Sequence, residues 1–282
     1  MDQAPHTLPH RSTSPAGATS ATNATKVALV TGAAKRLGRH IAITMAQRGW
    51  DVVVHYHQSA QDAQLTQQSI QALGRRAMSL CCDLADANSV AQIVPQIMAV
   101  FGRLDCVVNN ASLFDYDNAE DFSQARLDTH MHTNLAAPIL LAQALHRVTP
   151  DGQQAVVVNL LDQKLFNMNP DYLSYTLSKA GLHTATVMLA QALAPKVRVV
   201  GVAPGITLIS DKQTQAEFEK THQMTPLGRS STPDDISNTV CFLAEISGVT
   251  GATLLVDGGQ HLLPLARDVV FVAKQHALTE PD

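Results

Sequence analysis

A phenol and an ammonium group four residues apart are the clearest chemical feature of this sequence. Tyr175 and Lys179 belong to the run Tyr-Thr-Leu-Ser-Lys, and this spacing places two side chains on one face of a helix. A nearby cation favours the phenolate, so we expect Lys179 to lower the pKa of Tyr175 towards the range of a proton donor. The pair predicts proton transfer to a small molecule, and the alternative is a solvated pair on an amphipathic helix.

A glycine-containing turn lies far upstream of that pair. The β-branched run Val27–Val30 leads into Thr-Gly-Ala-Ala-Lys-Arg-Leu-Gly at residues 31–38, and a segment of helical length follows. Glycines in such a turn let backbone N–H groups approach a pyrophosphate, and the helix N-terminus stabilises its charge. A tight turn without a ligand is the alternative. The residues expected to bind the cofactor here are Gly32, Lys35, Arg36, Leu37 and Gly38.

The segment after the second apolar run bears on the choice of cofactor. NAD-selective sites usually carry Asp or Glu about twenty residues after the turn, on the ribose hydroxyls. Here the sequence reads His55-Tyr56-His57-Gln58-Ser59, without a carboxylate. Histidine and serine donors, together with Arg36, suit a 2′-phosphate. We therefore expect NADPH rather than NADH, unless these histidines are simple surface residues.

Two further polar segments follow predicted strands. Asp83-Leu84 comes directly after the third apolar run, where Asp83 is expected to contact the adenine. The competing role is that of a helix cap, for which Asp86 is the better candidate. Asn109-Asn110-Ala111-Ser112 follows the fourth run, at the carboxyl edge where open α/β sheets bind ligands. We expect Asn110, Ala111 and Ser112 to lie beside the cofactor.

Alternating strands and helices must position these residues. Apolar runs predict seven strands, at residues 27–30, 52–55, 77–81, 104–108, 155–160, 197–202 and 253–256. Segments of helical length lie at residues 39–48, 61–73, 89–101, 175–193 and 234–245. Such a pattern predicts a single doubly wound (Rossmann) α/β domain, with a parallel sheet covered by helices on both faces. Pro95 and Pro138 are expected to kink or divide the helices that contain them.

The chain as a whole limits the remaining possibilities. Residues 1–24, rich in Pro, Ser, Thr and Ala, are expected to be a disordered leader, residues 25–264 the folded domain and residues 265–282 a C-terminal extension. A net charge of −4 with dispersed basic residues argues against nucleic acid. The sequence contains no apolar run long enough to predict a helix that spans a membrane. The cysteines lack metal spacing and predict buried thiols in a reducing cytoplasm: Cys81, Cys82, Cys106 and Cys241.

Taken in order, these motifs resemble those of the short-chain dehydrogenase/reductase family. The resemblance covers residues 26–263 and rests on residues 31–38, Asn109-Asn110-Ala111, Asn134, Tyr175 with Lys179, Pro204-Gly205 and Val256-Asp257-Gly258-Gly259. It implies a nicotinamide cofactor, a homotetramer and a proton relay through Tyr175, Lys179 and Asn134. It also implies that Pro204, Gly205 and Ile206 flank the nicotinamide. Lys179 would bind the nicotinamide ribose.

Two positions depart from the usual pattern of that family. Arg36 replaces the middle glycine of the turn, and Asp162 replaces the catalytic serine thirteen residues before the tyrosine. A carboxylate would repel the oxyanion that develops during ketone reduction. When a ring C=N bond is reduced, however, the nitrogen gains a proton, which a carboxyl of raised pKa can deliver. Asp162 therefore favours a ring imine, and a degenerate enzyme is the alternative.

Both departures also occur in the pteridine reductases and bacterial dihydromonapterin reductases, which this chain resembles. Phe114, after the Asn110-Ala111-Ser112 run, belongs to the same pattern. The resemblance implies that Phe114 stacks on a pterin against the nicotinamide and that Tyr172 lines the pocket. It implies that Ser112 and Arg36 contact the pterin or a cofactor phosphate.

Two other segments are interpreted through the family. Residues 207–224 are polar, at the place where the family carries its mobile substrate lid. The run Val269–Val272 lies beyond the family's usual end and is expected to pack at a subunit interface.

The sequence thus predicts an NADPH-dependent reductase of dihydropteridines such as dihydrobiopterin, dihydromonapterin or dihydrofolate. One alternative is a ketone or quinone reductase that tolerates Asp162, and another is a non-catalytic NADPH-binding sensor. Acyl-carrier substrates are less favoured because Asp162 replaces the serine of ketoacyl reductases. Tyr172 has the Tyr-x₆-Lys spacing of enoyl reductases relative to Lys179, but Tyr175 fits the remaining pattern better.

Overall fold

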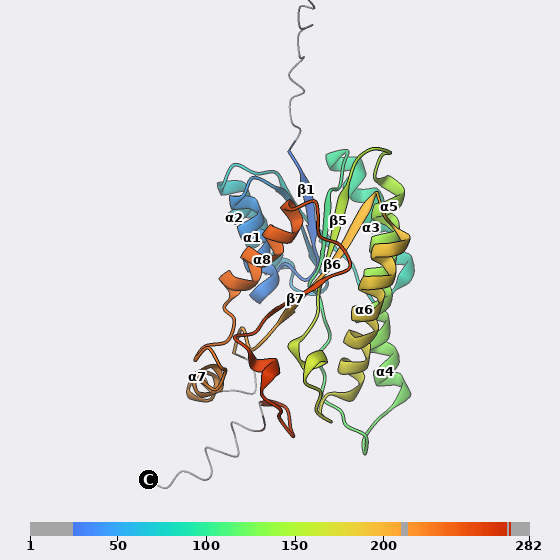
Figure 1. Ribbon diagram of the computed structural model, residues 1–282. Helices are drawn as coiled ribbons and strands as arrows, with labels where there is room; N and C mark the ends of the chain where they lie inside the picture. The colour runs from blue at the N-terminus through green and yellow to red at the C-terminus, as the bar shows by residue number, and fades with distance from the viewer. Residues whose placement is uncertain (1–24, 210–213, 270, 272–282) are drawn as a thin grey trace, which may run out of the picture.

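Seven parallel strands form one sheet in the order β3-β2-β1-β4-β5-β6-β7 (Figure 1). This computed structural model describes residues 25–209, 214–269 and 271. The predicted leader, residues 1–24, lies outside that part of the chain. The strands are β1 (Val27–Val30), β2 (Asp51–Tyr56), β3 (Ala77–Cys81), β4 (Cys106–Asn109), β5 (Ala155–Leu160), β6 (Val197–Pro204) and β7 (Thr253–Val256). The predicted doubly wound α/β fold is confirmed.

Helices cover both faces of this sheet. They are α1 (Arg36–Gln47), α2 (Ala60–Ala72), α3 (Ala87–Phe101), α4 (Gln124–Met131), α5 (Ala137–Val148), α6 (Leu173–Ala192), α7 (Gln215–Gln223) and α8 (Pro233–Glu245). In Figure 1, α1, α2 and α8 lie on one side of the sheet, and α3, α5 and α6 lie on the other. Ala28 and Val30 of β1 pack on the first side, whereas Val27 and Leu29 pack on the second. This alternation along a strand is what buries both faces.

The two prolines behave differently from one another. Pro95 lies inside α3, and the helix continues without a break from Ala87 to Phe101, so it does not divide the helix. Asp86 caps that helix, as predicted, by accepting hydrogen bonds from the backbone N–H groups of Asn88 and Ser89. Pro138 stands in the first turn of α5, directly after a π-helical turn at residues 132–136. Proline fits a first turn because its missing N–H would have no helical partner there.

The cysteines are all free thiols, and one differs from the expected burial. Cys82, Cys106 and Cys241 are buried, but Cys81 is exposed at the end of β3. Among the described strands, β3 pairs only with β2, so its side chains have less cover than those of the central strands. Within the described part of the chain, no helix is both long and apolar enough to cross a membrane.

The strand order places the predicted motifs together. Neighbouring strands β1 and β4 are far apart in the sequence, and the chain winds outwards from them in both directions. Open α/β sheets bind ligands at such a switch point, outside the carboxyl ends of the strands. The segments after β1, β2, β3, β4 and β5 all begin at that edge of the sheet.

Candidate active site

The turn after β1 is held in place by hydrogen bonds between side chains and backbone that join it to the segment after β4. Gly32 has a φ of +62°, which favours glycine. The side-chain amide of Asn110 donates to the carbonyl oxygen of Thr31 at 2.8 Å. In return, the Thr31 hydroxyl accepts hydrogen bonds from the N–H groups of Asn110 at 2.9 Å and Ala111 at 3.0 Å. Asn110 therefore fixes the turn against the end of β4.

His55 supports the same turn from β2. The Gly32 N–H donates to His55 Nδ1 at 3.1 Å, which requires the tautomer whose Nε2–H donates to the Cys82 carbonyl at 3.1 Å. Burial lowers the pKa of His55 to about 4, so the ring is neutral. Both ring nitrogens of His55 already bind the backbone, which leaves neither of them for a 2′-phosphate. His55 still lines the cavity beside the turn, and its contact with a cofactor stays a prediction.

Gly38 allows α1 to begin close to the turn. A Cβ atom at this position would lie 2.2 Å from the Gly32 carbonyl oxygen and 2.5 Å from the Asn110 side-chain nitrogen. Real Cβ atoms do not approach backbone so closely, so only glycine fits here. The N-terminus of α1 is consequently held beside the turn, as a pyrophosphate site requires.

A cavity of about 530 Å³ opens beside this turn. Most of the predicted cofactor residues line it: Gly32, Lys35, His55, Tyr56, His57, Ser59, Asp83, Leu84, Ala111 and Ser112. Lys35 lies 3.0 Å from Asp62, and His57 lies 4.0 Å from Asp83. The ends of β1, β2, β3 and β4 thus line one cavity, which we call the cofactor cavity after the predicted ligand; the binding of a cofactor by these residues stays a prediction.

A second cavity of about 270 Å³ is lined by two of the predicted catalytic residues, Asp162 and Tyr175, but not by Lys179 or Asn134. We call it the substrate cavity after the predicted ligand. The residues around it are Arg36, Phe114, Asp162, Gln163, Tyr175, Gly205, Ile206, Leu208, Gln260, Asp268 and Val269. Arg36 does not line the cofactor cavity, so its expected role at the 2′-phosphate is not supported by the geometry. Its guanidinium instead donates to the Ile209 carbonyl at 2.8 Å. Arg36 belongs to the substrate side of the site.

Asp162 and Tyr175 are hydrogen-bonded to each other in this substrate cavity. The Tyr175 hydroxyl donates to Asp162 Oδ2 at 2.7 Å, and the Lys164 N–H donates to Asp162 Oδ1 at 2.8 Å. Asp162 begins a short 3₁₀ helix after β5, and Tyr175 lies in the first turns of α6. Lys179 donates from Nζ to the Leu160 carbonyl at 2.7 Å, with Nζ 5.9 Å from the centre of the Tyr175 ring.

Burial governs the protonation of these three groups. It raises the pKa of Asp162 above its ordinary value, against the hydrogen bonds from Tyr175 and Lys164. The expected raised pKa is thus confirmed. Burial and the neighbouring Asp162 charge raise the pKa of Tyr175 as well. The expectation that Lys179 lowers it is wrong, since the carboxyl contacts the phenol more directly. Burial also lowers the pKa of Lys179 to about 8.

Asn134 holds the site together from the π-helical turn before α5. Its Oδ1 accepts from the Leu113 N–H at 2.8 Å, and its amide donates to the Leu113 carbonyl at 3.1 Å. The same amide donates to the Ser178 hydroxyl at 3.0 Å. These contacts join the loop after β4 to α6, so Asn134 positions both Phe114 and the Tyr175 helix. Its part in a proton relay stays a prediction.

An aromatic group forms one wall of the substrate cavity. The Phe114 ring is 47% exposed, stacks on Tyr172 with 4.2 Å between centroids, and meets the edge of Tyr175 at 4.7 Å. Tyr172 is 4% exposed and is not among the residues that line the cavity. The Phe114 ring thus lies between Tyr172 and the cavity, and a contact of Tyr172 with a substrate stays a prediction. Tyr172 supports Phe114 from behind.

Two further segments were interpreted through the family, the predicted lid at residues 207–224 and the C-terminal extension. In the segment 207–224, helix α7 carries a capping box of Thr214 and Glu217, and residues 210–213 lie outside the described part. In the extension, Val269 lines the substrate cavity, and Phe271 packs on Tyr116 of the same chain at 5.4 Å. The packing of this run at a subunit interface stays a prediction, since these contacts lie within one chain. Val270 and Val272 lie outside the described residues.

Sequence reasoning gave no site role to five residues that line the substrate cavity. They are Gln163, Leu208, Gln260, Asp268 and Val269, of which Leu208 falls in the predicted lid segment. Gln163 follows Asp162 directly and could have been found by that adjacency. Asp268 gave no signal, because it lies beyond the motifs that carry the family resemblance.

Comparison with known proteins agrees with this geometry. A family model described as enoyl-(acyl carrier protein) reductase matches residues 32–261. The 3-oxoacyl-(acyl-carrier-protein) reductase FabG of Staphylococcus aureus is 32% identical over 247 residues, covering 84% of this chain and 99% of that protein. L-rhamnose 1-dehydrogenase (NAD(P)(+)) of a Sphingomonas species is 33% identical over 245 residues, with 84% and 96% covered.

A solved structure is similar over most of the chain. FolM alternative dihydrofolate reductase 1 from Brucella canis, complexed with NADP, matches with a TM-score of 0.82 and 36% sequence identity. The match covers 87% of this chain and 97% of that one. With these relatives, the chain belongs to the short-chain dehydrogenase/reductase family. It is an oxidoreductase of a family whose cofactors are nicotinamide dinucleotides.

Proposed function

We propose that the protein is an NADPH-dependent reductase of dihydropteridines, which reduces a ring C=N bond. The observation that carries this proposal is the hydrogen bond of 2.7 Å from the Tyr175 hydroxyl to the buried Asp162 carboxyl. A carboxyl at this position suits a reaction in which a ring nitrogen gains a proton. It does not suit a developing ketone oxyanion, which a carboxylate would repel.

The residues of the site account for the proton. When bound, NADPH supplies a hydride to the ring carbon. Asp162, whose pKa is raised by burial, gives a proton from its protonated form to the ring nitrogen and becomes a carboxylate. The Tyr175 hydroxyl and the Lys164 N–H then stabilise that carboxylate through hydrogen bonds already in place. The ammonium group of Lys179 donates to the Leu160 carbonyl at 2.7 Å. It lies 5.9 Å from the centre of the Tyr175 ring, so it adds a positive charge near the pair of Asp162 and Tyr175.

The cofactor cavity fits NADPH. The glycine turn and the N-terminus of α1 present backbone N–H groups and no Cβ atom at positions 32 and 38. Lys35, His57 and Ser59 line the cavity near the end of β2, where they would bind a 2′-phosphate. The NADP-bound FolM protein from Brucella canis supports the same cofactor. Asn110 and His55 act indirectly by holding the turn.

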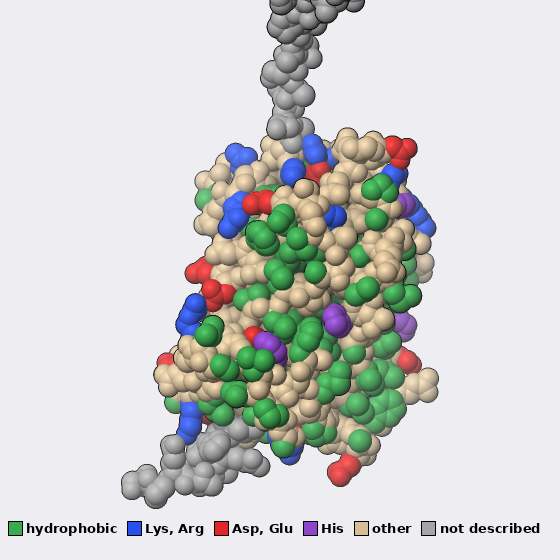
Figure 2. Space-filling view, in the orientation of Figure 1, with side chains coloured by type: hydrophobic (Ala, Val, Ile, Leu, Met, Phe, Trp, Pro, Cys, Tyr) green, Lys and Arg blue, Asp and Glu red, His purple; other side chains and the backbone are tan. Residues whose placement is uncertain are grey.

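A homotetramer is part of this proposal. Leu177, Val187 and Met188 of α6 are 47%, 42% and 63% exposed. Figure 2 shows hydrophobic side chains gathered in the region of α4 and α6. Apolar surface of this kind is typical of a protein–protein contact, and the family resemblance implies four copies.

A substrate panel tests the function. NADPH oxidation is followed with dihydrobiopterin, dihydromonapterin, dihydrofolate and several ketones, for the wild type and for Asp162→Ser. We expect turnover of a dihydropteridine that falls at least a hundredfold in Asp162→Ser, as is usual when a proton donor is removed. Asp151→Ser, at an exposed aspartate paired with Lys196 on the opposite edge of the sheet, is the matched control and should behave as the wild type.

The other outcomes identify the rivals. Ketone turnover that is unaffected by Asp162→Ser indicates a ketone or quinone reductase, as the names of the FabG and L-rhamnose dehydrogenase relatives would suggest. Tight NADPH binding without any turnover indicates a sensor. Equal efficiency with NADH would contradict the roles given to Lys35, His57 and Ser59.

A further inference from the structure

The substrate cavity contains residues from beyond the part of the chain that the family model matches. That match ends at residue 261, yet Asp268 and Val269 line the same cavity as Asp162 and Tyr175. We call residues 267–271 the C-terminal strap, in which position 270 lies outside the described residues. The strap brings a second carboxylate into the site.

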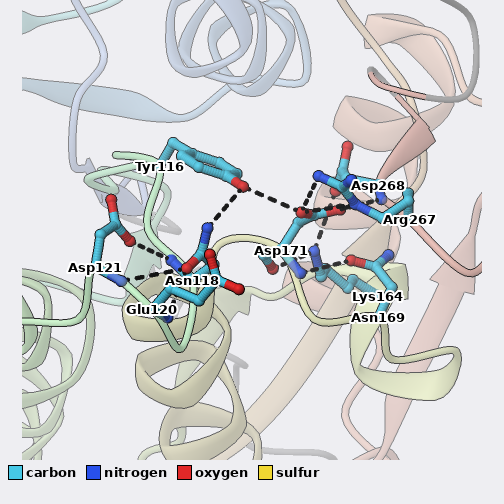
Figure 3. Close-up of polar contacts among 9 residues, drawn as sticks. All are labelled: Tyr116, Asn118, Glu120, Asp121, Lys164, Asn169, Asp171, Arg267 and Asp268. Atoms are coloured by element: carbon cyan, nitrogen blue, oxygen red, sulfur yellow. Dashed lines mark hydrogen bonds and ion pairs between the residues drawn. The ribbon is translucent and has the colours of Figure 1, made fainter. Parts of the chain in front are cut away.

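A pair of charged residues anchors the strap. Arg267 donates to both carboxylate oxygens of Asp171, with distances of 2.8 to 3.1 Å, and the Asp268 N–H donates to Asp171 Oδ2 at 2.7 Å (Figure 3). Asp171 is 2% exposed. Although burial raises its pKa, the hydrogen bonds from Arg267 and Asp268 bring the pKa of Asp171 below its ordinary value. A bidentate pair of this kind fixes direction as well as distance.

Lys164 joins the anchor to the Asp268 carboxylate. Its side chain is 3% exposed, donates to the Asp171 carbonyl at 2.6 Å and lies 3.2 Å from Asp268 Oδ2. The Lys164 N–H also binds Asp162. One residue therefore holds both carboxyl groups of the cavity, Asp162 through its backbone and Asp268 through its ammonium group.

The strap also supports the aromatic wall. Phe271 meets Tyr116 at 5.4 Å between centroids and lies 6.4 Å from Tyr172, the residue behind Phe114. The Arg267 guanidinium lies 4.8 Å from the centre of the Phe271 ring. The strap is thus packed on one side by rings and faces the cavity with Asp268 and Val269.

The cavity is rich in hydrogen-bond acceptors. Asp268 is 13% exposed, so its carboxylate is held rather than freely solvated. Gln163 adds a buried Oε1 that has no hydrogen-bond partner within the described residues. An unsatisfied buried acceptor is costly, and a ligand N–H would satisfy it. Acceptors recognise N–H donors, whereas a ketone or quinone offers only oxygen acceptors.

We propose that Asp268 is a specificity-determining residue that accepts hydrogen bonds from N–H groups on the substrate ring. This inference rests on the proposed function and goes beyond it. Asp162 delivers the proton, and Asp268 selects rings that carry amino or amide N–H donors. Lys164 and the Arg267–Asp171 pair position Asp268 for this contact.

The test compares Asp268→Asn with the wild type, both saturated with NADPH and assayed with dihydrobiopterin. We expect KM to rise about tenfold to a hundredfold, as for loss of a charge-assisted hydrogen bond, with kcat changed by less than about threefold. The KM for NADPH should not change. Calorimetric titration of fully oxidised biopterin into the NADP-loaded enzyme should show the same loss of affinity without any turnover.

Matched variants separate a direct contact from a structural effect. Asp268→Glu keeps the charge and should retain much of the affinity, whereas Arg267→Ala loosens the anchor and should raise KM by a smaller factor than Asp268→Asn. Asp151→Asn, on the exposed aspartate at the opposite edge of the sheet, should leave all constants unchanged. Asp268→Glu and Arg267→Ala also decide the question if Asp268→Asn fails to fold.

The results distinguish this inference from the proposed function. If the wild type reduces dihydrobiopterin and the folded variants keep its KM, the role of Asp268 is overturned while the function stands. If the wild type neither reduces nor binds any pterin, the function and the role of Asp268 fail together.

Discussion

The two cavities of this protein are built by different kinds of interaction. In the cofactor cavity, neutral hydrogen bonds from His55 and Asn110 hold the turn that contains Gly32, and the charged groups Lys35 and Asp83 lie at its surface. The substrate cavity depends on charged groups such as Asp171 and Arg267, which are 96 residues apart in the chain. The first cavity is thus formed at the edge of the sheet, whereas the second depends on segments attached to it, and on the proposed function these would bind the cofactor and select the substrate.

This difference extends to the protonation of buried groups. His55 beside the cofactor turn is neutral because burial lowers its pKa to about 4. In the substrate cavity, burial raises the pKa of Asp162 and lowers that of Lys179 to about 8. The first region needs an uncharged ring as an acceptor, and the second needs groups that can hold or release a proton.

The largest expected effect comes from breaking the cofactor turn alone. Gly38→Ala would place a Cβ atom 2.2 Å from the Gly32 carbonyl, and relief of that overlap costs about 2–3 kcal/mol. We expect NADPH affinity, measured by fluorescence titration, to fall on the order of a hundredfold. The melting temperature should also fall.

Gly248→Ala is the control for that change. Gly248 is exposed, and an added Cβ would meet nothing within 4 Å. This variant should bind NADPH as the wild type does. Wild-type affinity in Gly38→Ala would show that the turn is not the rigid element proposed for the cofactor cavity.

A change of pH should act on the two regions in opposite directions. The folded pKa of His55, about 4, lies below its ordinary 6.5, so its contribution to stability is complete above about 6.5 and is lost as pH falls towards 4. On the alkaline side, kcat/KM should fall as pH rises through about 8, because Lys179 loses its charge. Melting temperatures and steady-state rates across this range measure the two effects separately.

His55→Asn sharpens the acid side of this comparison. Asparagine can accept the Gly32 N–H but does not titrate, so the melting temperature of this variant should depend less on pH between 4 and 6.5 than that of the wild type. His146→Asn, on α5 away from both cavities, should retain the wild-type dependence. In both variants, kcat/KM should still fall as pH rises through about 8. If this fall disappeared in His55→Asn, the two regions would not be separate.

The smallest effect concerns Arg36, which lines the substrate cavity at the start of α1. Its φ is +50°, a conformation that costs a non-glycine residue about 1 kcal/mol. Arg36→Gly and Arg36→Ala both remove the guanidinium, but only alanine keeps the strain. We expect Arg36→Gly to be more stable by about 1 kcal/mol in urea unfolding, with similar KM values in both. Equal stability would show that the turn relaxes around this residue.

The sequence predicted the sheet well because its signals are local. The runs at β1, β3, β5 and β7 have the predicted bounds, since apolar β-branched residues between turns specify buried strands. The turn, Asp162 and the Tyr175–Lys179 pair were also found, because their chemistry depends on residue type and spacing. One error lies at Tyr175, where burial and the neighbouring Asp162 raise the pKa that Lys179 was expected to lower.

The sequence by itself determined the family, the parallel sheet and the residues that can do chemistry, because each follows from a short pattern. Only the tertiary structure decided which way those side chains turn. In the folded chain, His55 hydrogen-bonds to the backbone of the turn and Arg36 lines the substrate cavity. Tyr172 stacks on Phe114. Folding also brings Asp268 to Lys164, which lies 104 residues earlier in the chain. The partner of a charged side chain cannot be predicted from a short pattern, because the two groups meet only in the folded chain.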